Sequence, residues 1–381
     1  MRKLSDTLAR LSALRSVHHQ AAAPGIVDRL ADLTGFGTNP GALRARTYVP
    51  PQLPRHAPLV VVLHGCTQSA AAYDHGSGWS TLADAHGFAL LFPEQTRSNN
   101  ANLCFNWFEP ADTGRGSGEA LSIRQMIARM VADHGIDEER IFITGLSAGG
   151  AMTSVMLATY PEVFAGGAII AGLPYDVAAT VPEAFDRMRG HGSPSGPELA
   201  QRVLDASDHA GPWPTVSVWH GNADQTVSVA NADAILEQWR GVHGLPAHSS
   251  ETSLVDGHMR RRGGDRLEFH LISGMGHGTP LQTRGGDGLG HAGPFMLDQG
   301  ISSTRHIARS WSIVAASDTA VARANDDRPL EASEFVHSTE MPPAAERFEP
   351  RPQRPATPSG AGADPIRSVI ETALRQAGLM K

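Results

Sequence analysis

Short runs of consecutive apolar residues alternate along the chain with longer stretches in which apolar residues recur every three or four positions. The run "PLVVVLHG" (58–65) has no polar alternation, which is typical of a strand covered on both faces. Later runs of the same kind are "GFALLFPEQ", "RIFITG", "AGGAIIAGLP", "TVSVWHG" and "LEFHLISG". Helix-like stretches such as "EALSIRQMIARMVADHG" lie between most of them. This alternation predicts an α/β protein with a mostly parallel central sheet flanked by helices.

The pattern changes in three places, which suggest the domain organisation. Residues 174–214 mix Pro, Gly and Ser with helical pieces, and we expect a lid-like insertion over the carboxyl edge of the sheet. After about residue 316 the periodicity fades into a Pro-rich stretch that cannot pack a core. We predict an N-terminal amphipathic segment (1–39), one domain (40–318), and a largely disordered tail (319–381) ending in a short helix.

Charge and composition exclude several classes of protein. The 381 residues include 32 Lys and Arg against 39 Asp and Glu, so no basic face for nucleic acid is expected. We interpret the one dense basic run, 260–262, as a solvated loop. No apolar stretch approaches the ~20 residues of a membrane span, and the N-terminus shows no conventional signal peptide. The 18 histidines show no metal-binding spacing, so we expect neither a metal nor another cofactor.

The segment "RIFITGLSAGGAMTSVMLATYP" (140–161) places Ser147 where a predicted strand gives way to a predicted helix. Gly145 and Gly149 flank it at positions where larger side chains would collide. A serine in such a turn is raised above the sheet with a helix N-terminus behind it, which is the nucleophile elbow. The segment therefore predicts an α/β-hydrolase fold with Ser147 as the nucleophile.

A serine nucleophile needs a base and an acid that orients the base, and in this fold they follow in the order Ser, Asp or Glu, His. Asp224 follows the predicted strand "TVSVWHG", and His277 follows "LEFHLISG". We therefore predict Asp224 as the acid and His277 as the base. The rivals lie inside predicted helices or strands, or in other loops: Asp233, Asp256, Asp265, His258, His270 and His291.

The oxyanion that develops during ester cleavage needs two backbone N–H donors. Ala148, directly after the nucleophile, should supply one. The other should come from the loop after "VVVLHG", which leaves Cys66 and Thr67 as alternatives. We expect His64 to shape this loop rather than to react.

The sequence resembles the esterase family of poly(3-hydroxybutyrate) depolymerases in several blocks that occur in the family's order. The blocks, within about residues 40–315, are "LHGCTQ" (63–68), "CFNWF" (104–108), "GEALSI" (118–123), "GLSAGGAMT" (145–153), "AGLPY" (171–175), "WHGNADQTV" (219–227) and "GMGHGTPLQ" (274–282). The resemblance implies a serine esterase that cleaves poly- or oligo(3-hydroxybutyrate)-type esters through an acyl-enzyme. It implies the triad Ser147, Asp224 and His277, with Cys66 and Ala148 at the oxyanion hole.

The resemblance also bears on Trp107 and on the two cysteines. It suggests that Trp107 lines the acyl site, and an ordinary core position is the alternative. It favours a disulfide between Cys66 and Cys104, with two buried thiols as the alternative. It implies an extracellular or periplasmic enzyme, whereas the lack of a visible signal peptide leaves a cytoplasmic enzyme as the alternative.

The substrate class has alternatives as well. The related feruloyl and acetylxylan esterases share the fold and the triad, so a carbohydrate esterase is the second candidate. Polymer-degrading relatives carry a separate substrate-binding domain, whereas here a Pro-rich linker and a short helix are expected, which favours oligomers or soluble esters. The third candidate is a non-catalytic protein whose amphipathic ends bind polymer granules.

Overall fold

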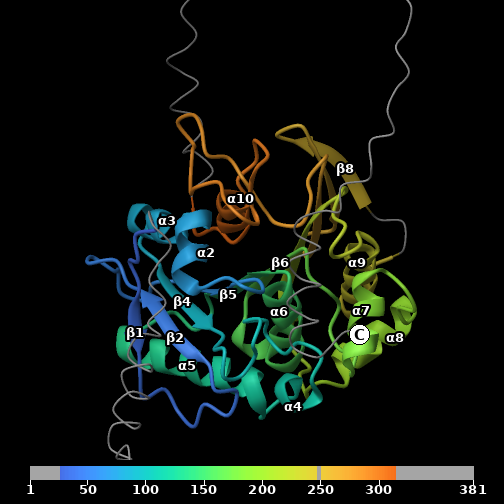
Figure 1. Ribbon diagram of the computed structural model, residues 1–381, viewed down its shortest axis with the longest axis horizontal. Coiled ribbons are helices and arrows are strands. Elements are labelled where there is room, and N and C mark those ends of the chain that lie inside the picture. The colour runs from blue at the N-terminus through green and yellow to red at the C-terminus, as the bar shows by residue number, and fades with distance from the viewer. Residues whose placement is uncertain (1–25, 247–249, 315–381) are drawn as a thin grey trace, which may run out of the picture.

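The computed structural model describes residues 26–246 and 250–314 (Figure 1). Most of the predicted N-terminal amphipathic segment lies outside the described residues. The predicted Pro-rich tail and the helix expected at its end also lie outside them.

One sheet of ten strands runs through the described part of the chain in the order β1-β2-β4-β3-β5-β6-β7-β10-β9-β8. The central strands, from β4 to β10 in this order, are parallel, and the outer strands pair antiparallel at both edges. The strands are β1 (Ala31–Leu33), β2 (Arg44–Tyr48), β3 (Leu59–Leu63), β4 (Ala89–Glu94), β5 (Ile141–Leu146), β6 (Gly166–Ile170), β7 (Thr215–Gly221), β8 (Ser250–Val255), β9 (His258–Gly263) and β10 (Leu267–Ile272). The predicted mostly parallel sheet is confirmed.

Strand β3 shows why the apolar runs lack polar alternation. Its residues 59, 61 and 63 enter the hydrophobic core on one face of the sheet, and Val60 and Val62 enter the core on the other. All five residues of the strand are buried. A central parallel strand is covered by helices on both faces, so every position along it must be apolar.

The helices form two layers around the sheet (Figure 1). Helices α2, α3 and α10 supply buried residues to one core, whereas α5, α6, α8 and α9 supply them to the other. The helices are α2 (Ala70–Ser77), α3 (Trp79–His86), α4 (Pro110–Thr113), α5 (Gly118–His134), α6 (Ala148–Thr159), the 3₁₀ turn η1 (Pro161–Val163), α7 (Val181–Met188), α8 (Gly196–Leu204), α9 (Ala230–Val242) and α10 (Ser303–Ser310).

The predicted insertion, residues 174–214, contains helices α7 and α8 between strands β6 and β7. Figure 1 shows α7, α8 and α9 grouped on one side of the molecule. The Thr180 hydroxyl accepts the Glu183 N–H at the start of α7, and Ser195 with Glu198 forms a capping box at the start of α8. The segment is thus built of two capped helices, and its role as a lid stays a prediction.

The interpretation of residues 260–262 as a loop is wrong, because they lie on β9 in an antiparallel hairpin with β8. Asp256 and Gly257 form the turn and both have positive φ, 48° and 80°. An Asp-Gly pair is a strong signal for such a hairpin. Two of the arginines pair with acidic residues of neighbouring elements: Arg261 lies 3.2 Å from Asp233 and over the Phe269 ring, and Arg260 lies 3.5 Å from Glu268.

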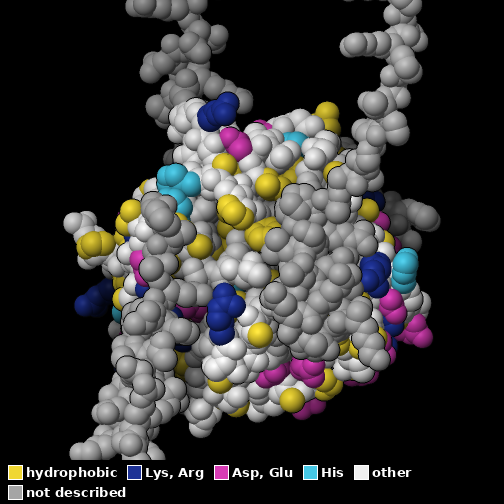
Figure 2. Space-filling model, in the orientation of Figure 1, with side chains coloured by type: hydrophobic (Ala, Val, Ile, Leu, Met, Phe, Trp, Pro, Cys, Tyr) yellow, Lys and Arg dark blue, Asp and Glu magenta, His cyan; other side chains and the backbone are white. Residues whose placement is uncertain are grey.

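Beyond β10, a short two-stranded sheet pairs β11 (Thr279–Leu281) with β12 (Met296–Asp298). Basic and acidic side chains are interspersed on the face drawn in Figure 2. No helix among residues 26–246 and 250–314 is long and apolar enough to span a bilayer.

Candidate active site

Ser147 occupies a sharp turn between β5, which ends at Leu146, and α6, which begins at Ala148. Its backbone has φ 57° and ψ −118°, a conformation that side-chain-bearing residues rarely adopt. The turn is held from both sides: the Ser147 N–H donates to the Ile170 carbonyl at 2.9 Å, and the Ser147 carbonyl accepts the Ala151 N–H at 2.8 Å. The predicted elbow therefore exists, with the strain located at the serine itself.

The glycines around Ser147 let helix α6 lie against the end of β3. A Cβ atom on Gly149 would lie 2.5 Å from the carbonyl oxygens of both Leu63 and His64. A Cβ atom on Gly145 would overlap the backbone of Gly149. These positions exclude any side chain, so the two glycines are required by close approach of backbone to backbone.

Ser147, His277 and Asp224 come together at the carboxyl edge of the sheet. His277 Nε2 lies 2.8 Å from Ser147 Oγ, and His277 Nδ1 lies 2.7 Å from Asp224 Oδ2. The three residues follow β5, β10 and β7, whose carboxyl ends lie at the same edge. A hydroxyl, an imidazole and a carboxylate in this order can pass a proton from the oxygen to the ring while the carboxylate stabilises the charged ring.

Asp224 is held as a carboxylate. Its Oδ1 accepts the N–H groups of Thr226 and Val227 at 2.8 and 2.9 Å, while Oδ2 faces His277. Burial favours the neutral acid, but the neighbouring His277 and these N–H donors outweigh it, so the pKa of Asp224 lies below its ordinary value. His220 is also close, with Nε2 at 3.5 Å from Oδ2 and 2.8 Å from the Val227 carbonyl.

The rival acids and imidazoles each have other neighbours. Asp233 pairs with Arg261, Asp265 lies near Arg262, and Asp256 lies 2.8 Å from His306. His258 faces the Gln299 carbonyl, His270 stacks on Trp219, and His291 stacks on His75. Within the described residues, none of these six has a hydrogen bond to Ser147 or His277.

The loop after β3 presents one unused N–H group beside Ser147. The Thr67 N–H donates to the Asn102 carbonyl at 2.8 Å, and the Gly65 N–H donates to Gln68 Oε1 at 2.9 Å. In the part of the chain that the structure describes, the N–H groups of Cys66 and Ala148 have no acceptor. The geometry thus favours Cys66 over Thr67 as the second donor to an oxyanion.

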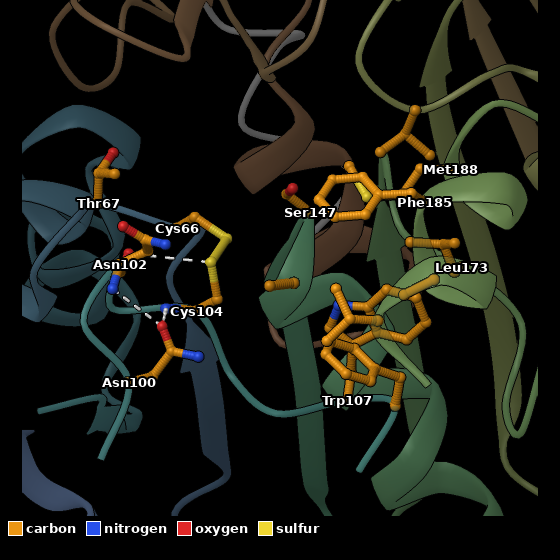
Figure 3. Close-up of a pocket in the computed structure, with 15 residues that line it drawn as sticks. Cys66, Thr67, Asn100, Asn102, Cys104, Trp107, Ser147, Leu173, Phe185 and Met188 are labelled. Atoms are coloured by element: carbon orange, nitrogen blue, oxygen red, sulfur yellow. Dashed lines mark hydrogen bonds between the residues drawn. A yellow bond between two sulfur atoms is a disulfide. The ribbon is translucent and has the colours of Figure 1, made fainter. Parts of the chain in front are cut away.

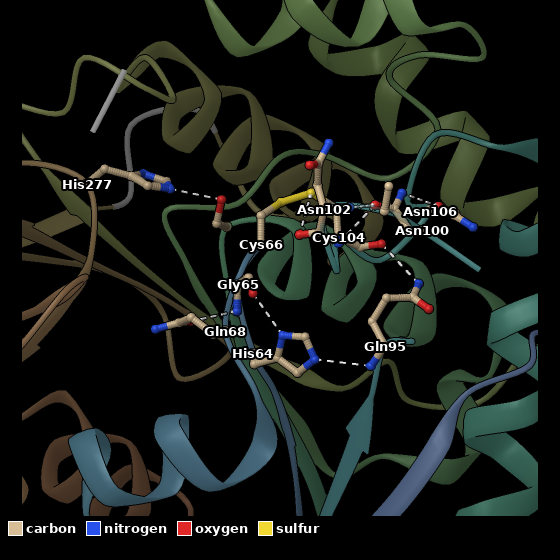
Figure 4. The surroundings of a disulfide bond; sticks show 12 residues. His64, Gly65, Cys66, Gln68, Gln95, Asn100, Asn102, Cys104, Asn106 and His277 are labelled. Atoms are coloured by element: carbon tan, nitrogen blue, oxygen red, sulfur yellow. Dashed lines mark hydrogen bonds between the residues drawn. A yellow bond between two sulfur atoms is a disulfide. The ribbon is translucent and has the colours of Figure 1, made fainter. Parts of the chain in front are cut away.

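A disulfide joins Cys66 to Cys104 (Figure 4). It ties the loop after β3 to the segment 95–108, which carries the "CFNWF" block. The side chain of Phe105 is fully buried and lies 5.0 Å, ring centre to ring centre, from His64. The segment is therefore attached to the β3 loop by a covalent bond and by packing.

A pocket opens beside Ser147, with different chemistry on its two sides (Figure 3). Thr67, Asn100 and Asn102 lie on one side with the disulfide, and Trp107, Leu173, Phe185 and Met188 lie on the other. Trp107 is 7% exposed and belongs to a core cluster, yet it also lines the pocket. The two interpretations of Trp107 are thus compatible.

The sequence did not predict that α7 contributes to the apolar side of this pocket. Phe185 and Met188 line the pocket from the segment that we expected to be an insertion, but no local motif marks them. Asn100 and Asn102 belong to a polar loop without periodicity. Their position depends on how this loop folds back to Thr67.

Comparison with known proteins places the chain among carboxylic-ester hydrolases. The family model described as esterase PHB depolymerase matches residues 42–262. Poly(3-hydroxyalkanoate) depolymerase C of Paucimonas lemoignei is 44% identical over 305 residues, 77% of this chain and 72% of that protein. Probable acetylxylan esterase A of Aspergillus flavus is 32% identical over 278 residues, 70% of this chain and 90% of that protein.

A solved structure shares the fold. The acetyl xylan esterase from Aspergillus awamori superposes with a TM-score of 0.65 at 24% identity, covering 75% of this chain and 99% of that one. The resemblance that the sequence blocks suggested is confirmed by the family match. The chain is a serine esterase with an α/β-hydrolase fold and belongs to the esterase PHB depolymerase family.

Proposed function

We propose that this esterase cleaves the ester bonds of 3-hydroxyalkanoate oligomers or polymers through an acyl-enzyme on Ser147. The observation that carries the proposal is the unbroken hydrogen-bond path from Ser147 through His277 to Asp224. The 44% identity to a poly(3-hydroxyalkanoate) depolymerase supports the substrate class.

Acylation begins when Ser147 Oγ attacks the ester carbonyl and its proton moves to His277 Nε2. The Asp224 carboxylate accepts the hydrogen bond from Nδ1–H and stabilises the imidazolium. The N–H groups of Cys66 and Ala148 donate to the oxyanion of the tetrahedral intermediate. When this intermediate collapses, the bond to the alcohol oxygen breaks and the alcohol leaves with the proton from Nε2.

Deacylation repeats the sequence with water. His277 Nε2 takes a proton from the water as its oxygen attacks the acyl carbonyl. Collapse of the second intermediate breaks the bond to Ser147 Oγ, which takes the proton back from Nε2. The product is a free hydroxy acid or a shortened oligomer, and the enzyme returns to its starting state.

The pocket suits a short aliphatic acyl group. Trp107, Leu173 and Phe185 form an apolar wall beside Ser147, against which a methyl-branched acyl chain can lie. On the opposite side, Thr67 and Asn102 offer polar groups to the remaining ester and hydroxyl groups of such a chain. A hydroxyalkanoate presents both kinds of surface within one repeat.

A carbohydrate esterase is the second candidate. The 32% identity to a probable acetylxylan esterase over 90% of that protein favours it, because the same triad can release acetate. The family match and the 44% identity to a depolymerase argue against the third alternative, a non-catalytic granule-binding protein.

The deciding experiment measures release of 3-hydroxybutyrate from defined oligomers beside release of product from acetylated xylan and methyl ferulate. We expect the highest kcat/KM on the hydroxybutyrate oligomers and no turnover above background with Ser147→Ala. A preference for acetylated xylan or methyl ferulate would support the second candidate. Full activity of folded Ser147→Ala would end the acyl-enzyme assignment.

We further propose that the enzyme works in an extracellular or periplasmic compartment. The support is the disulfide at the active-site loop, because such bonds persist where the environment is oxidising. The test is to treat the culture medium, and cells at the moment of lysis, with a reagent that blocks free thiols, and then to locate the protein. We expect the protein to carry no free thiol and to lie outside the cytoplasm. A reduced cytoplasmic protein would contradict it.

A further inference from the structure

A set of buried and half-buried polar residues lies beneath the oxyanion loop and takes no part in the proton path described above. We call it the Glu119 network; it consists of His64, Gln95, Asn99, Asn106 and Glu119. It connects two sequence blocks to which the proposed mechanism assigns no role, "GEALSI" (118–123) and the Asn106 region of "CFNWF" (104–108). Figure 4 shows His64, Gln95 and Asn106 on the loops that the disulfide joins.

Glu119, in the first turn of α5, is the centre of this network. Its side chain is fully buried, and its carboxyl group accepts three N–H donors. These are Gln95 Nε2 at 2.6 Å, Asn99 Nδ2 at 3.0 Å and the Asn106 backbone N–H at 2.9 Å. No Arg or Lys among the described residues pairs with it, and burial raises the pKa of Glu119 to about 8. Burying a carboxyl group without a cation is costly, and these three hydrogen bonds offset that cost and fix the orientation of the group.

Gln95 connects Glu119 to Cys104 and to His64, which lies in the same loop as Cys66. Its side-chain Nε2 also donates to the Cys104 carbonyl at 2.9 Å. Its backbone N–H donates to His64 Nε2 at 3.1 Å. Because Nε2 accepts, the proton of the buried neutral ring is on Nδ1, which donates to the Gly65 carbonyl at 2.8 Å.

The Gly65 carbonyl belongs to the same peptide unit as the Cys66 N–H. This unit is planar and trans, so its C=O and N–H bonds point in opposite directions. His64 holds the carbonyl oxygen at 2.8 Å, with a longer bond of 3.3 Å from the Gln68 N–H, and holding this oxygen fixes the direction of the Cys66 N–H. The hydrogen bond to the carbonyl also polarises the peptide, which strengthens the N–H as a donor.

We infer that Glu119 is a positioning residue for ester hydrolysis, which acts through Gln95 and His64 to aim the Cys66 N–H at the oxyanion. The inference rests on the proposed function, in which Cys66 is an oxyanion donor. His64 is then the last residue in this series of hydrogen bonds, and it contacts the peptide unit that bears the Cys66 N–H directly.

Glu119→Gln, assayed at about pH 9, is the first test. Above its pKa of about 8 the wild-type side chain is a carboxylate with two acceptor oxygens, and the amide keeps its shape but replaces one acceptor by a donor. The amide would face N–H groups of the network, and Gln95 cannot turn without losing its bonds to Cys104 and Thr96. Loss of an oxyanion donor costs about 10² to 10³ in kcat, so misdirecting one should cost about tenfold to a hundredfold. KM for a short soluble ester should stay within about threefold, because the contact forms in the transition state.

Glu94→Gln is the matched control. Glu94 is also buried, lies next to Gln95, accepts the Ala70 N–H at 2.8 Å and pairs with Arg44. Its charge acts on His64, but it has no hydrogen bond to the oxyanion loop, so this control separates the effect of charge from that of the hydrogen-bond path. We expect it to lower Tm and to leave kcat per folded enzyme within about twofold of wild type. Equal losses of kcat in the two variants would overturn the inference.

Two His64 variants test the last step and remain informative if Glu119→Gln does not fold. His64→Leu removes the ring donor and leaves the Gly65 carbonyl with the longer bond from the Gln68 N–H, 3.3 Å, whereas His64→Asn keeps an N–H group near the position of Nδ1. We expect His64→Asn to retain about tenfold more kcat than His64→Leu at similar KM. Equal kcat in both, or kcat of folded Glu119→Gln within about twofold of wild type, overturns the inference.

Ser147→Ala, measured in parallel, separates this inference from the proposed function. If folded Ser147→Ala still turns over ester, the proposed function fails. If it is inactive while Glu119→Gln and His64→Leu remain active, only the positioning role of Glu119 fails.

Discussion

At the scale of residues, the proposed mechanism makes the Ser147 hydroxyl a weak nucleophile until His277 accepts its proton, which His277 can do only in one tautomer. Asp224 fixes this tautomer by accepting from Nδ1, which leaves Nε2 free to face Ser147. The two backbone N–H groups on its other oxygen hold the carboxylate in place. In the proposed mechanism, Asp224 therefore acts on catalysis through the orientation of the His277 ring.

Asp224→Asn should leave the fold intact and lower kcat by about 10³ to 10⁴, because the amide favours the wrong tautomer of His277. Steady-state kinetics on a soluble ester and a circular dichroism spectrum check this. Asp233→Asn is the control, since Asp233 contacts Arg261 on the outer strand β9. If Asp233→Asn caused the larger loss, the acid would be misassigned.

Sequence alone predicts residues that follow a strand more easily than residues that meet through loops. Ser147, Asp224 and His277 each follow an apolar run, so their shared edge follows from the α/β pattern. The alternative between Cys66 and Thr67 could not be decided in this way, because it depends on a hydrogen bond from Thr67 to Asn102. The partners of Glu119 likewise come from a polar loop without any periodic signal.

At the scale of elements, helix α7 gives the pocket much of its apolar wall. Ala184, Phe185 and Met188 line the pocket, while Asp186 is exposed on the same helix. The insertion was visible in the sequence as a break in the pattern, but the face that α7 turns to the pocket was not. That face is set by packing against residues from other elements, including Leu173 and Val227.

Phe185→Ala should raise KM for esters with a C4 or longer acyl chain by about tenfold, because a buried aromatic contact of about 1 to 2 kcal/mol is lost. The kcat should change little, since the triad and the oxyanion donors are untouched. KM across an acyl-length series measures this, with Asp186→Ala as the control on the same helix. An unchanged KM would show that α7 does not contact the acyl chain.

The hairpin of β8 and β9 was not predicted from the sequence. Its charged residues suggested a loop, although the Asp-Gly pair at 256–257 marked a hairpin turn. Polar residues are tolerated there because this hairpin lies at the edge of the sheet, where one face meets solvent. Continuous apolar runs identify the central strands, whereas edge strands need the turn signal.

At the scale of the whole molecule, the disulfide closes a long section of chain around the active-site loop. Cys66 and Cys104 are 38 residues apart, and their bond should contribute roughly 3 to 4 kcal/mol in the chain-entropy model. We expect reduction to lower both Tm and kcat, since the same bond holds the loop that bears the Cys66 N–H.

Thermal unfolding and ester turnover with and without a thiol reductant test this prediction. The double variant Cys66→Ala with Cys104→Ala is the control, and its Tm should not respond to reductant. Wild-type protein whose Tm and kcat do not change after complete reduction, verified by thiol titration, would contradict the prediction.

Glu119 should make the stability of the whole fold depend on pH. Its pKa is about 8 in the native state against an ordinary 4.5, so in between the native state holds a proton that the unfolded state releases. The contribution is fully present below about pH 4.5 and is lost as pH rises through about 8. The free energy of unfolding should fall in this window by at most about 1.4 kcal/mol per pH unit.

Urea unfolding of wild type and Glu119→Gln between pH 5 and 9 isolates this group, because other titrations affect both proteins alike. The stability difference between the two should shrink as pH rises. A difference that does not vary with pH would mean that Glu119 has the same pKa in both states.

The path from Ser147 to Asp224 joins residues 130 and 53 positions apart along the chain. During synthesis the elbow therefore emerges from the ribosome long before the histidine that activates it, and the last parallel strand, β10, must be in place before the two can meet. Catalytic competence is acquired only when the sheet is nearly complete. A nascent chain thus carries an inert serine, and the appearance of turnover in a refolding reaction times the final assembly of the sheet.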